Sequence, residues 1–279
     1  YRAAAHYRAY QTRRVAGLLR HAYDNTAFYR RKYDTAGVSP ASFRRLEDIE
    51  RFPTTTKSEL VEAIRAGELG STGRGGIESV SSGSSGRIIT VTHRASDTPA
   101  YAAGRFRILN MTGQLRPWVR TLYIYTSEFP ARSFFGLYQA YFISTLNDLG
   151  DTIERLRKIR PAVLSVYPSR LLEIAALLSA SEARALGIRH ISVNSETSSR
   201  RQRAAMAEHF GCPVLEEYST EELGWTAAEC EHGQLHVWED MACLELAMSR
   251  TGRPYRTQAR RRNLSAAIRG ARSCIGLRS

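Results

Sequence analysis

The fold of this chain is decided by residues 161–178, which read PAVLSVYPSRLLEIAALL. Residues 162–166 form a short apolar run of the kind that makes a buried strand. Pro168 follows, and proline is favoured in the first turn of a helix. Apolar residues then recur at helical spacing, at Leu171, Leu172, Ile174, Ala175 and Leu178. The stretch therefore predicts a strand that leads directly into a helix.

The same alternation continues on both sides of this stretch. A helix is predicted from Asp148, whose carboxylate can cap it, to the residue before Pro161. A strand at 188–193, a helix at 199–210 that ends at Gly211, and a strand beginning at Val214 follow. Helices alternating with strands favour an α/β fold, a parallel sheet covered by helices. In such a sheet, ligands gather at the carboxyl ends of the strands.

Upstream of this region, the sequence predicts a helical segment and further strands. Apolar residues at helical spacing and a capping box of Thr56 and Glu59 indicate that residues 1–66 are a helical cap. A glycine-rich loop follows at 67–76, and the α/β body spans 77–249. Within this body, residues 119–125 and 137–143 are expected to be strands, the second of them buried.

Composition limits the class of protein. A hydrophobic content of 43% is ordinary for a globular chain, and no apolar run is long enough to span a bilayer, so no membrane partner is expected. Four cysteines are too few for a disulfide framework, which favours a reducing, cytoplasmic setting. The net charge is +13, but residues 250–279 hold nine arginines and no acidic residue. The main domain therefore carries little excess charge, and a nucleic-acid partner is not expected for it.

A loop rich in serine and glycine spans residues 81–87, Ser-Ser-Gly-Ser-Ser-Gly-Arg. Glycines let backbone amides turn inward, and hydroxyl groups and the arginine add donors, so the loop suits a polyphosphate. It lacks the Walker spacing. The alternative is a flexible hairpin turn between the strands on either side.

Two polar clusters follow predicted strands further along the chain. Ser195-Glu196 comes after the strand at 188–193, and residues 218–221, Tyr-Ser-Thr-Glu, come after the strand that begins at Val214. Because carboxyl ends of parallel strands share one edge, these clusters should converge on one crevice within reach of the serine-glycine loop.

Taken together, these segments resemble the adenylate-forming enzymes, most closely the phenylacetate–CoA ligase family and its CapK-like relatives of capsule biosynthesis. The resemblance covers about residues 1–249. Residues 81–87 resemble the family's nucleotide loop, residues 193–196 the turn that meets adenine, and residues 217–221 its Y-G-x-T-E signature. It also extends to Phe28-Tyr29-Arg30, Ala36-Gly37-Val38, Phe52-Pro53-Thr54-Thr55-Thr56-Lys57, Glu229-Cys230 and residues 235–240.

The resemblance implies part of the large domain of an adenylate-forming ligase. ATP and a small carboxylic acid would give an acyl-adenylate and pyrophosphate, and CoA or another acceptor would then take the acyl group. It assigns catalysis to Thr220 and Glu221 and magnesium to Glu221. ATP would contact the loop and the two turns, at Ser82, Gly83, Ser84, Ser85, Gly86, Arg87, Ser195, Glu196 and Tyr218.

Two positions depart from the family pattern. Arg87-Ile88 replaces the usual Lys-Pro, which keeps the charge but alters the turn. Tyr218-Ser219 lacks the usual glycine, so the backbone there is expected to approach adenine less closely. Neither change is expected to abolish activity.

Cys230 and His236 form a candidate zinc site, because cysteine and histidine are good zinc ligands. A structural site wants four ligands, and His232 and Cys243 are the further candidates. The alternative is a buried cysteine beside surface histidines, with no metal.

Residues 250–279 resemble no part of the family. The ribose-binding aspartate and the C-terminal lysine that the family implies are not recognised there, so we expect an aberrant or disordered tail on a truncated ligase that is inactive or impaired. Two other interpretations stay open: a non-catalytic module that binds a nucleotide or acyl-adenylate, and a nucleic-acid binder acting through the basic tail.

Overall fold

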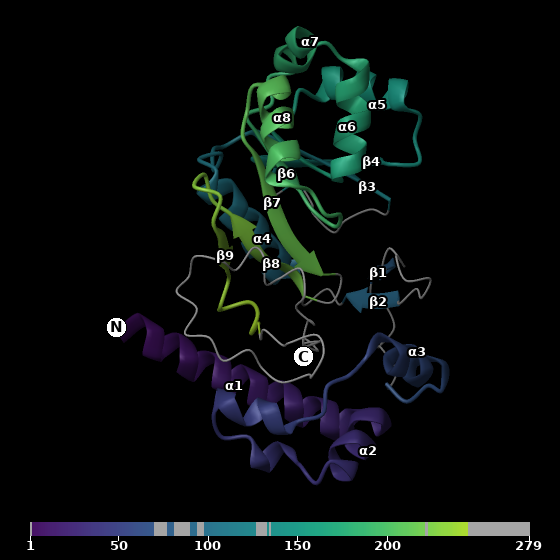
Figure 1. The fold of residues 1–279 in the computed structure, drawn as a ribbon, viewed down its shortest axis with the longest axis vertical. Helices are drawn as coiled ribbons and strands as arrows, with labels where there is room; N and C mark the ends of the chain where they lie inside the picture. The colour runs from purple at the N-terminus through teal and green to yellow at the C-terminus, as the bar shows by residue number, and fades with distance from the viewer. Residues whose placement is uncertain are drawn as a thin grey trace. The chain divides into compact units, whose positions relative to one another are not determined.

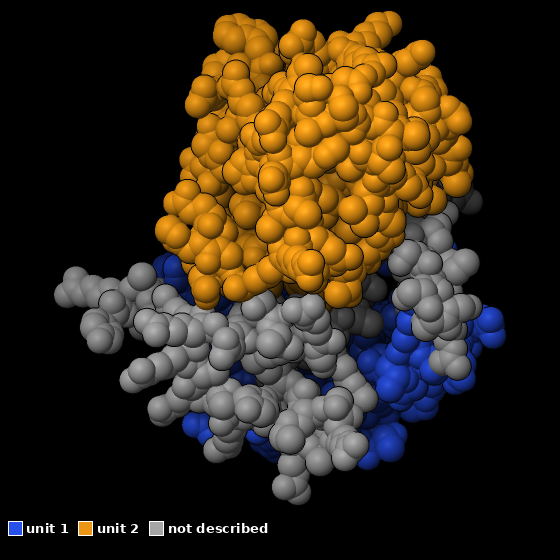
Figure 2. Space-filling view, turned by 45° about the horizontal axis from the view of Figure 1, so that its top comes forward, with its two compact units in different colours: residues 1–95, 221–226, 237–279 blue, residues 96–220, 227–236 orange. Residues whose placement is uncertain are grey.

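The computed structural model describes residues 2–69, 77–80, 90–93, 98–126, 133, 135–220 and 223–244. The chain divides into two compact units (Figure 2). Unit 1 consists of residues 1–95, 221–226 and 237–279, and unit 2 consists of residues 96–220 and 227–236.

Unit 1 begins with helices. They are α1 (Arg2–Asn25), α2 (Ala27–Thr35), the 3-10 helices η1 (Pro40–Ser42) and η2 (Leu46–Arg51), and α3 (Lys57–Arg65). Thr56 and Glu59 form the predicted capping box at the start of α3. Aromatic rings, including Tyr33 and Phe52 in edge contact, fill the core between the helices. Strands β1 (Ile77–Val80) and β2 (Thr90–His93) pair antiparallel as a separate two-stranded sheet.

Unit 2 holds the predicted alternation of helices and strands. Its elements are α4 (Thr98–Met111), β3 (Val119–Tyr125), β4 (Tyr138–Ser144), α5 (Leu149–Ile159), β5 (Val163–Val166), α6 (Pro168–Leu177), α7 (Ala180–Ala185), β6 (His190–Val193), α8 (Arg200–Phe210) and β7 (Val214–Thr220). The helix that was expected after β5, from Pro168 to about Leu178, is α6, and a further short helix, α7, lies between it and β6. The second of these begins with its own capping box at Ser179 and Glu182.

The main sheet has the strand order β4-β3-β5-β6-β7-β8-β9, completed by β8 (Gly224–Glu229) and β9 (Leu235–Val237). The pairs β3–β4, β3–β5, β5–β6 and β6–β7 are all parallel. This arrangement confirms the α/β fold with a parallel-rich sheet that the sequence predicted.

Helices cover both faces of this sheet. Helices α5, α6, α7 and α8 lie together on one face (Figure 1). The fully buried side chains of Leu122, Leu164 and Ile191 point into the core beneath them. On the other face, Leu109 of α4 packs against Val119 and Val163. Successive side chains of a strand point to opposite faces, so β3 and β5 contribute to both cores.

One strand is more exposed than the sequence predicted. Residues 137–143 were expected to form a buried strand, but Ile143 is the one fully buried residue of β4, and Leu137 is exposed. The reason is topological: β4 is the first strand of the sheet and has a neighbour only in β3.

The predicted ends of two helices are confirmed. Asp148 caps α5 by accepting hydrogen bonds from the backbone amides of Gly150 and Asp151, at 2.7 and 3.3 Å. Gly211 ends α8 with a φ of +69°, a left-handed conformation that glycine adopts without steric cost. Across the described ranges, no helix combines the length and apolarity that crossing a bilayer would require.

Candidate functional site

The chain reverses its direction of travel across the sheet at β3. From β3 it passes to β4 on one side and then, through α5, to β5 on the other side. In open α/β sheets, ligands bind at the carboxyl ends of the strands beside such a switch point. The carboxyl ends of β3, β5, β6 and β7 therefore form the candidate site.

The strand register puts four side-chain positions in one row at this edge. Ile124 is paired with Val166, Val166 with Val193, and Val193 with Glu216. The next residue of each segment is Tyr125, Tyr167, Asn194 and Glu217, respectively. All four carry groups that can form hydrogen bonds: two phenols, an amide and a carboxylate.

A buried hydrogen-bond network joins three side chains of this row to the Ser165 side chain of β5. The side-chain amide of Asn194 donates to the hydroxyl of Tyr125 at 2.7 Å and lies 3.4 Å from the Glu217 carboxylate. The Tyr125 hydroxyl also shares a hydrogen bond of 2.6 Å with the Ser165 hydroxyl. Asn194, Glu217 and Ser165 are buried, so the network holds the ends of β3, β5, β6 and β7 in a fixed arrangement.

Burial raises the pKa of Tyr125 well above its ordinary value of 10, and the nearby Glu217 charge raises it further. Hydrogen bonds from Asn194 and Ser165 favour the ionised form but do not outweigh burial. Tyr125 is therefore a neutral phenol throughout the physiological range, which can both accept from Asn194 and donate to Ser165.

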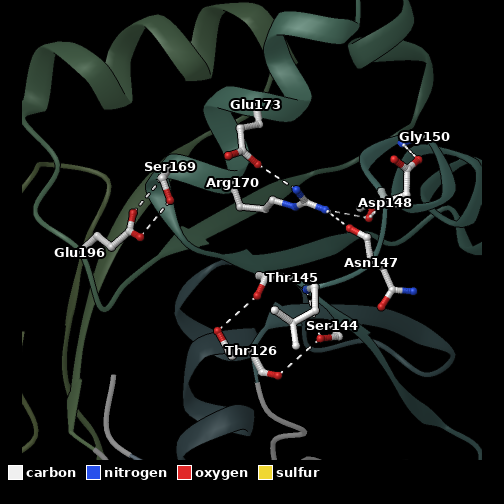
Figure 3. A network of polar contacts seen from close by, with 12 residues as sticks. Thr126, Ser144, Thr145, Asn147, Asp148, Gly150, Ser169, Arg170, Glu173 and Glu196 are labelled. Atoms are coloured by element: carbon white, nitrogen blue, oxygen red, sulfur yellow. Dashed lines mark hydrogen bonds and ion pairs between the residues drawn. The ribbon is translucent and has the colours of Figure 1, made fainter. Parts of the chain in front are cut away.

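The turn after β6 is conformationally constrained. Ser195 has a φ of +66°, which is uncommon for a residue other than glycine, and its hydroxyl donates to the Asn194 side-chain oxygen at 2.9 Å. The Glu196 carboxylate accepts hydrogen bonds from the backbone amide and the hydroxyl of Ser169, at 2.9 and 2.8 Å. Glu196 thus lies at the N-terminus of α6, where a negative charge is favourable (Figure 3).

A second polar network borders the same edge beside β3 and β4 (Figure 3). The hydroxyls of Thr126 and Thr145 lie 3.2 Å apart. Arg170 of α6 donates to the backbone oxygen of Asn147 at 2.8 Å and pairs with Glu173 at 2.8 Å. These contacts fix the loop between β4 and α5 to the start of α6.

The second predicted cluster, on β7, is placed differently from the sequence expectation. Tyr218 and Thr220 belong to β7 itself, which runs through Thr220, and do not follow the end of the strand as predicted. Both are half-buried. Val193 is paired with Glu216. Ser195 and Tyr218 each lie two residues beyond this pair, Ser195 in the turn after β6 and Tyr218 within β7. The structure therefore brings the Ser195–Glu196 turn and Tyr218 to the same edge of unit 2.

Several predicted site residues lie outside the described residues. These are Ser82, Gly83, Ser84, Ser85, Gly86, Arg87 and Glu221. Their assignments to phosphate and magnesium stay predictions.

A buried ion cluster supports β7 from α8. Arg203 donates to Glu229 of β8 and is paired with Glu216 of β7, both at 3.1 Å. It also donates to the backbone oxygen of Ser198 at 2.7 Å. The Arg203 and Glu229 side chains are each 7% exposed, so their charges depend on one another.

The candidate zinc residues are not gathered into a cluster. In the part of the chain that the structure describes, no group of three or more histidine, cysteine, aspartate or glutamate residues is arranged to hold a metal. Cys230 lies in a tight turn, in which its amide donates to the Gln234 oxygen at 2.9 Å. His236 is exposed.

Sequence reasoning did not predict the network of Tyr125, Ser165, Asn194 and Glu217, although Asn194 and Glu217 fall within the two segments that carry the family resemblance. Each is a polar residue within or directly after an apolar strand. That pattern is the signal that would have found them, because a polar side chain in a buried strand needs a partner.

Comparison with known proteins finds relatives that share one name, phenylacetate-coenzyme A ligase. No protein family model matches the chain. Phenylacetate-coenzyme A ligase of Thermus thermophilus is 28% identical over 261 residues, which cover 88% of this chain and 58% of that enzyme. The enzyme of the same name from Escherichia coli is 54% identical over 52 residues, 19% of this chain and 12% of that enzyme.

Solved structures show the same fold. A 2-hydroxyisobutyryl-CoA ligase in complex with 2-HIB-AMP and CoA superposes with a TM-score of 0.75 at 22% identity, over 88% of this chain and 56% of that one. An open conformation of the same ligase gives a TM-score of 0.72 at 21% identity, over 85% of this chain and 56% of that one. The chain thus spans somewhat more than half the length of the proteins that match most of it.

Proposed function

We propose that the chain is a phenylacetate–CoA ligase-like member of the adenylate-forming superfamily, and that it binds ATP and a small carboxylic acid and joins them as an acyl-adenylate. The observation that carries this proposal is the row of Tyr125, Asn194 and Glu217 at the carboxyl edge of the sheet. It holds the Ser195–Glu196 turn beside Tyr218, the two segments that the family resemblance assigns to adenine.

In the proposed reaction, an oxygen of the carboxylate attacks the α-phosphorus of ATP. The bond from that phosphorus to the bridging oxygen breaks, and pyrophosphate leaves with the negative charge. Donors at Ser82, Ser84, Ser85 and Arg87 would stabilise the charge that develops on the pyrophosphate. The rigid turn at Ser195 and Glu196, together with Tyr218, would hold the adenine so that the α-phosphate meets the acid.

The Glu196 carboxylate has a positioning role in this scheme. Both its oxygens are occupied at the N-terminus of α6. The turn would therefore face adenine with its backbone, while Glu196 keeps that backbone in place.

Magnesium would be held by Glu221 and by phosphate oxygens, with Thr220 beside it. Magnesium uses one or two protein carboxylates together with phosphates and water, so it needs no cluster of protein ligands. It would supply charge neutralisation on the phosphates. A structural zinc at Cys230 and His236 stays a prediction whose further ligands would have to come from outside the described residues.

The second half-reaction would transfer the acyl group to CoA or, as in a CapK-like enzyme, to another acceptor.

Pyrophosphate exchange into ATP, measured with a panel of aryl and short-chain carboxylic acids, tests this proposal. Exchange that requires both an acid and Mg²⁺, and that is lost in Arg87→Gln but kept in Arg201→Gln, is the expected result. Arg201 is an exposed residue of α8 and serves as the matched control. Saturable ATP binding without exchange for any acid would instead favour a non-catalytic nucleotide-binding module.

A further inference from the structure

The opposite edge of the same sheet carries a basic cavity. Its volume is about 410 Å³, and it lies where the chain enters β3, β5 and β6. Four arginines line it, Arg116, Arg120, Arg160 and Arg189, together with Trp118. It belongs entirely to unit 2. Because it lies at the amino ends of the strands, it is separate from the edge to which adenylation is assigned.

The sheet itself aligns two of the arginines. Thr121 is paired with Val163, and Val163 with His190, so the preceding residues Arg120, Ala162 and Arg189 occupy one row. Residues of one row in a parallel sheet point to the same face, and two strand spacings place the backbones of the outer members about 10 Å apart. Ala162, the middle member of this row, has only a methyl side chain and lines the cavity together with both arginines.

Backbone hydrogen bonds fix the positions of Arg120, Ala162 and Arg189 at the amino ends of β3, β5 and β6. The amide of Ala162 donates to the Arg120 oxygen at 2.9 Å, and the amide of Arg189 donates to the Ala162 oxygen at 2.8 Å. The arginines therefore project from a fixed base, which lowers the entropy that a ligand must overcome on binding.

The charges of this cavity are not compensated from within. Among the described residues that line it, none is acidic. No described residue forms an ion pair with Arg116, Arg120, Arg160 or Arg189, whereas Arg157, Arg170 and Arg203 of the same unit are each paired with a glutamate. Four like charges around one small cavity repel one another, and a multivalent anion would relieve that repulsion.

Trp118 adds an aromatic surface beside these charges. Its side chain is 69% exposed, whereas the other tryptophans, Trp225 and Trp238, are 5% exposed. It also has a φ of +60°, a conformation that is costly for a bulky residue and that the surrounding structure must maintain. An exposed indole on such a constrained backbone is available to stack against a planar ring.

We propose that this cavity binds a small molecule that carries two or more phosphate groups and a planar ring, of the nucleotide class. Arginine forks match phosphate oxygens in a bidentate manner, and Trp118 supplies the stacking surface. A volume of about 410 Å³ is within the range of small-molecule pockets. An extended nucleic acid or an acidic peptide would need a longer basic surface than these residues provide.

The fluorescence of Trp118 tests this proposal on the full chain. ADP and inorganic tripolyphosphate are titrated at near-physiological salt while acrylamide quenching is followed. ADP is expected to shield Trp118 from acrylamide, and tripolyphosphate is expected to compete with it. The double variant Arg120→Gln/Arg189→Gln should weaken ADP binding at least tenfold, whereas the control Arg201→Gln should leave it unchanged. Trp118→Phe should remove the signal but keep tripolyphosphate binding measurable by calorimetry.

Three outcomes would overturn the proposal. Equal ADP affinity in the double variant and the wild type would place binding elsewhere. Absence of shielding by ADP at millimolar concentration would exclude a nucleotide. Shielding by an acidic peptide or a short RNA, but not by ADP, would assign the cavity to a macromolecular partner. Unfolding of the variants is detected by circular dichroism, and in that case Arg116→Gln/Arg160→Gln, whose side chains are exposed, replaces the double variant.

Discussion

Asn194 and Tyr125 are joined by a hydrogen bond of 2.7 Å although 69 residues separate them in the sequence. The bond connects the carboxyl ends of β6 and β3, with β5 between them. Ser165 on β5 and Glu217 on β7 complete the network, so four strand ends are held by buried polar contacts. The candidate nucleotide site is thus built on strand ends that buried hydrogen bonds hold together.

Removing the Tyr125 hydroxyl should destabilise the fold and weaken nucleotide binding. Tyr125→Phe leaves the Asn194 amide and the Ser165 hydroxyl without this partner, at a cost of about 1–3 kcal/mol in the free energy of unfolding. The control is Tyr141→Phe, whose hydroxyl donates to Gln139 on the half-buried edge strand and should cost less. Urea denaturation of both variants compares them, and an equal loss would contradict the role of the network.

The turn at Ser195 should tolerate glycine and reject a β-branched residue. Its φ of +66° lies in the left-handed region, which glycine adopts freely and valine does not. Ser195→Gly is expected to change stability by less than about 1 kcal/mol, whereas Ser195→Val is expected to cost about 1–3 kcal/mol. Thermal unfolding and ATP affinity are measured for both. Similar behaviour of the two variants would argue against a fixed left-handed turn.

The buried cluster around Arg203 should be far more sensitive than an exposed ion pair. Arg203→Met leaves Glu229, 7% exposed, without its charge partner and is expected to cost about 3–5 kcal/mol. The matched variant Arg157→Met breaks the exposed pair with Glu182 and should cost less than about 1 kcal/mol. Chemical denaturation measures both, and comparable losses would refute the difference.

His190 should make unit 2 less stable in acid. Burial lowers its pKa to about 4 from 6.5, so the unfolded chain takes up a proton first as the pH falls. The free energy of unfolding is therefore unaffected by His190 above about pH 6.5. It falls by roughly 3 kcal/mol as the pH drops from about 6.5 to about 4, because only the unfolded chain binds the proton there. His190→Gln should flatten the pH dependence of unfolding in that interval. An unchanged pH profile would show that His190 is not the titrating group.

Much of this fold was predictable, because the alternation from Asp148 to Glu217 and the caps at Asp148, Thr56 and Gly211 are local signals. The exposure of β4 was not predictable from its composition, since it follows from the order of strands in the sheet. The sequence indicated Ser195, Glu196 and Tyr218, which do lie at one edge. It did not reveal that Glu196 binds Ser169, because that partner is 27 residues away and comes close only through the packing of α6 beside β6.

Titration calorimetry with Mg-ATP measures whether the chain binds the nucleotide that adenylation requires. It is run on the wild type and on Arg120→Gln/Arg189→Gln, which removes the contribution of the basic cavity. We expect saturable one-site heat in the double variant, lost in a further Arg87→Gln substitution and unchanged by Arg201→Gln. The absence of heat with Mg-ATP in the folded wild-type chain would contradict both the ligase proposal and the nucleotide-binding alternative.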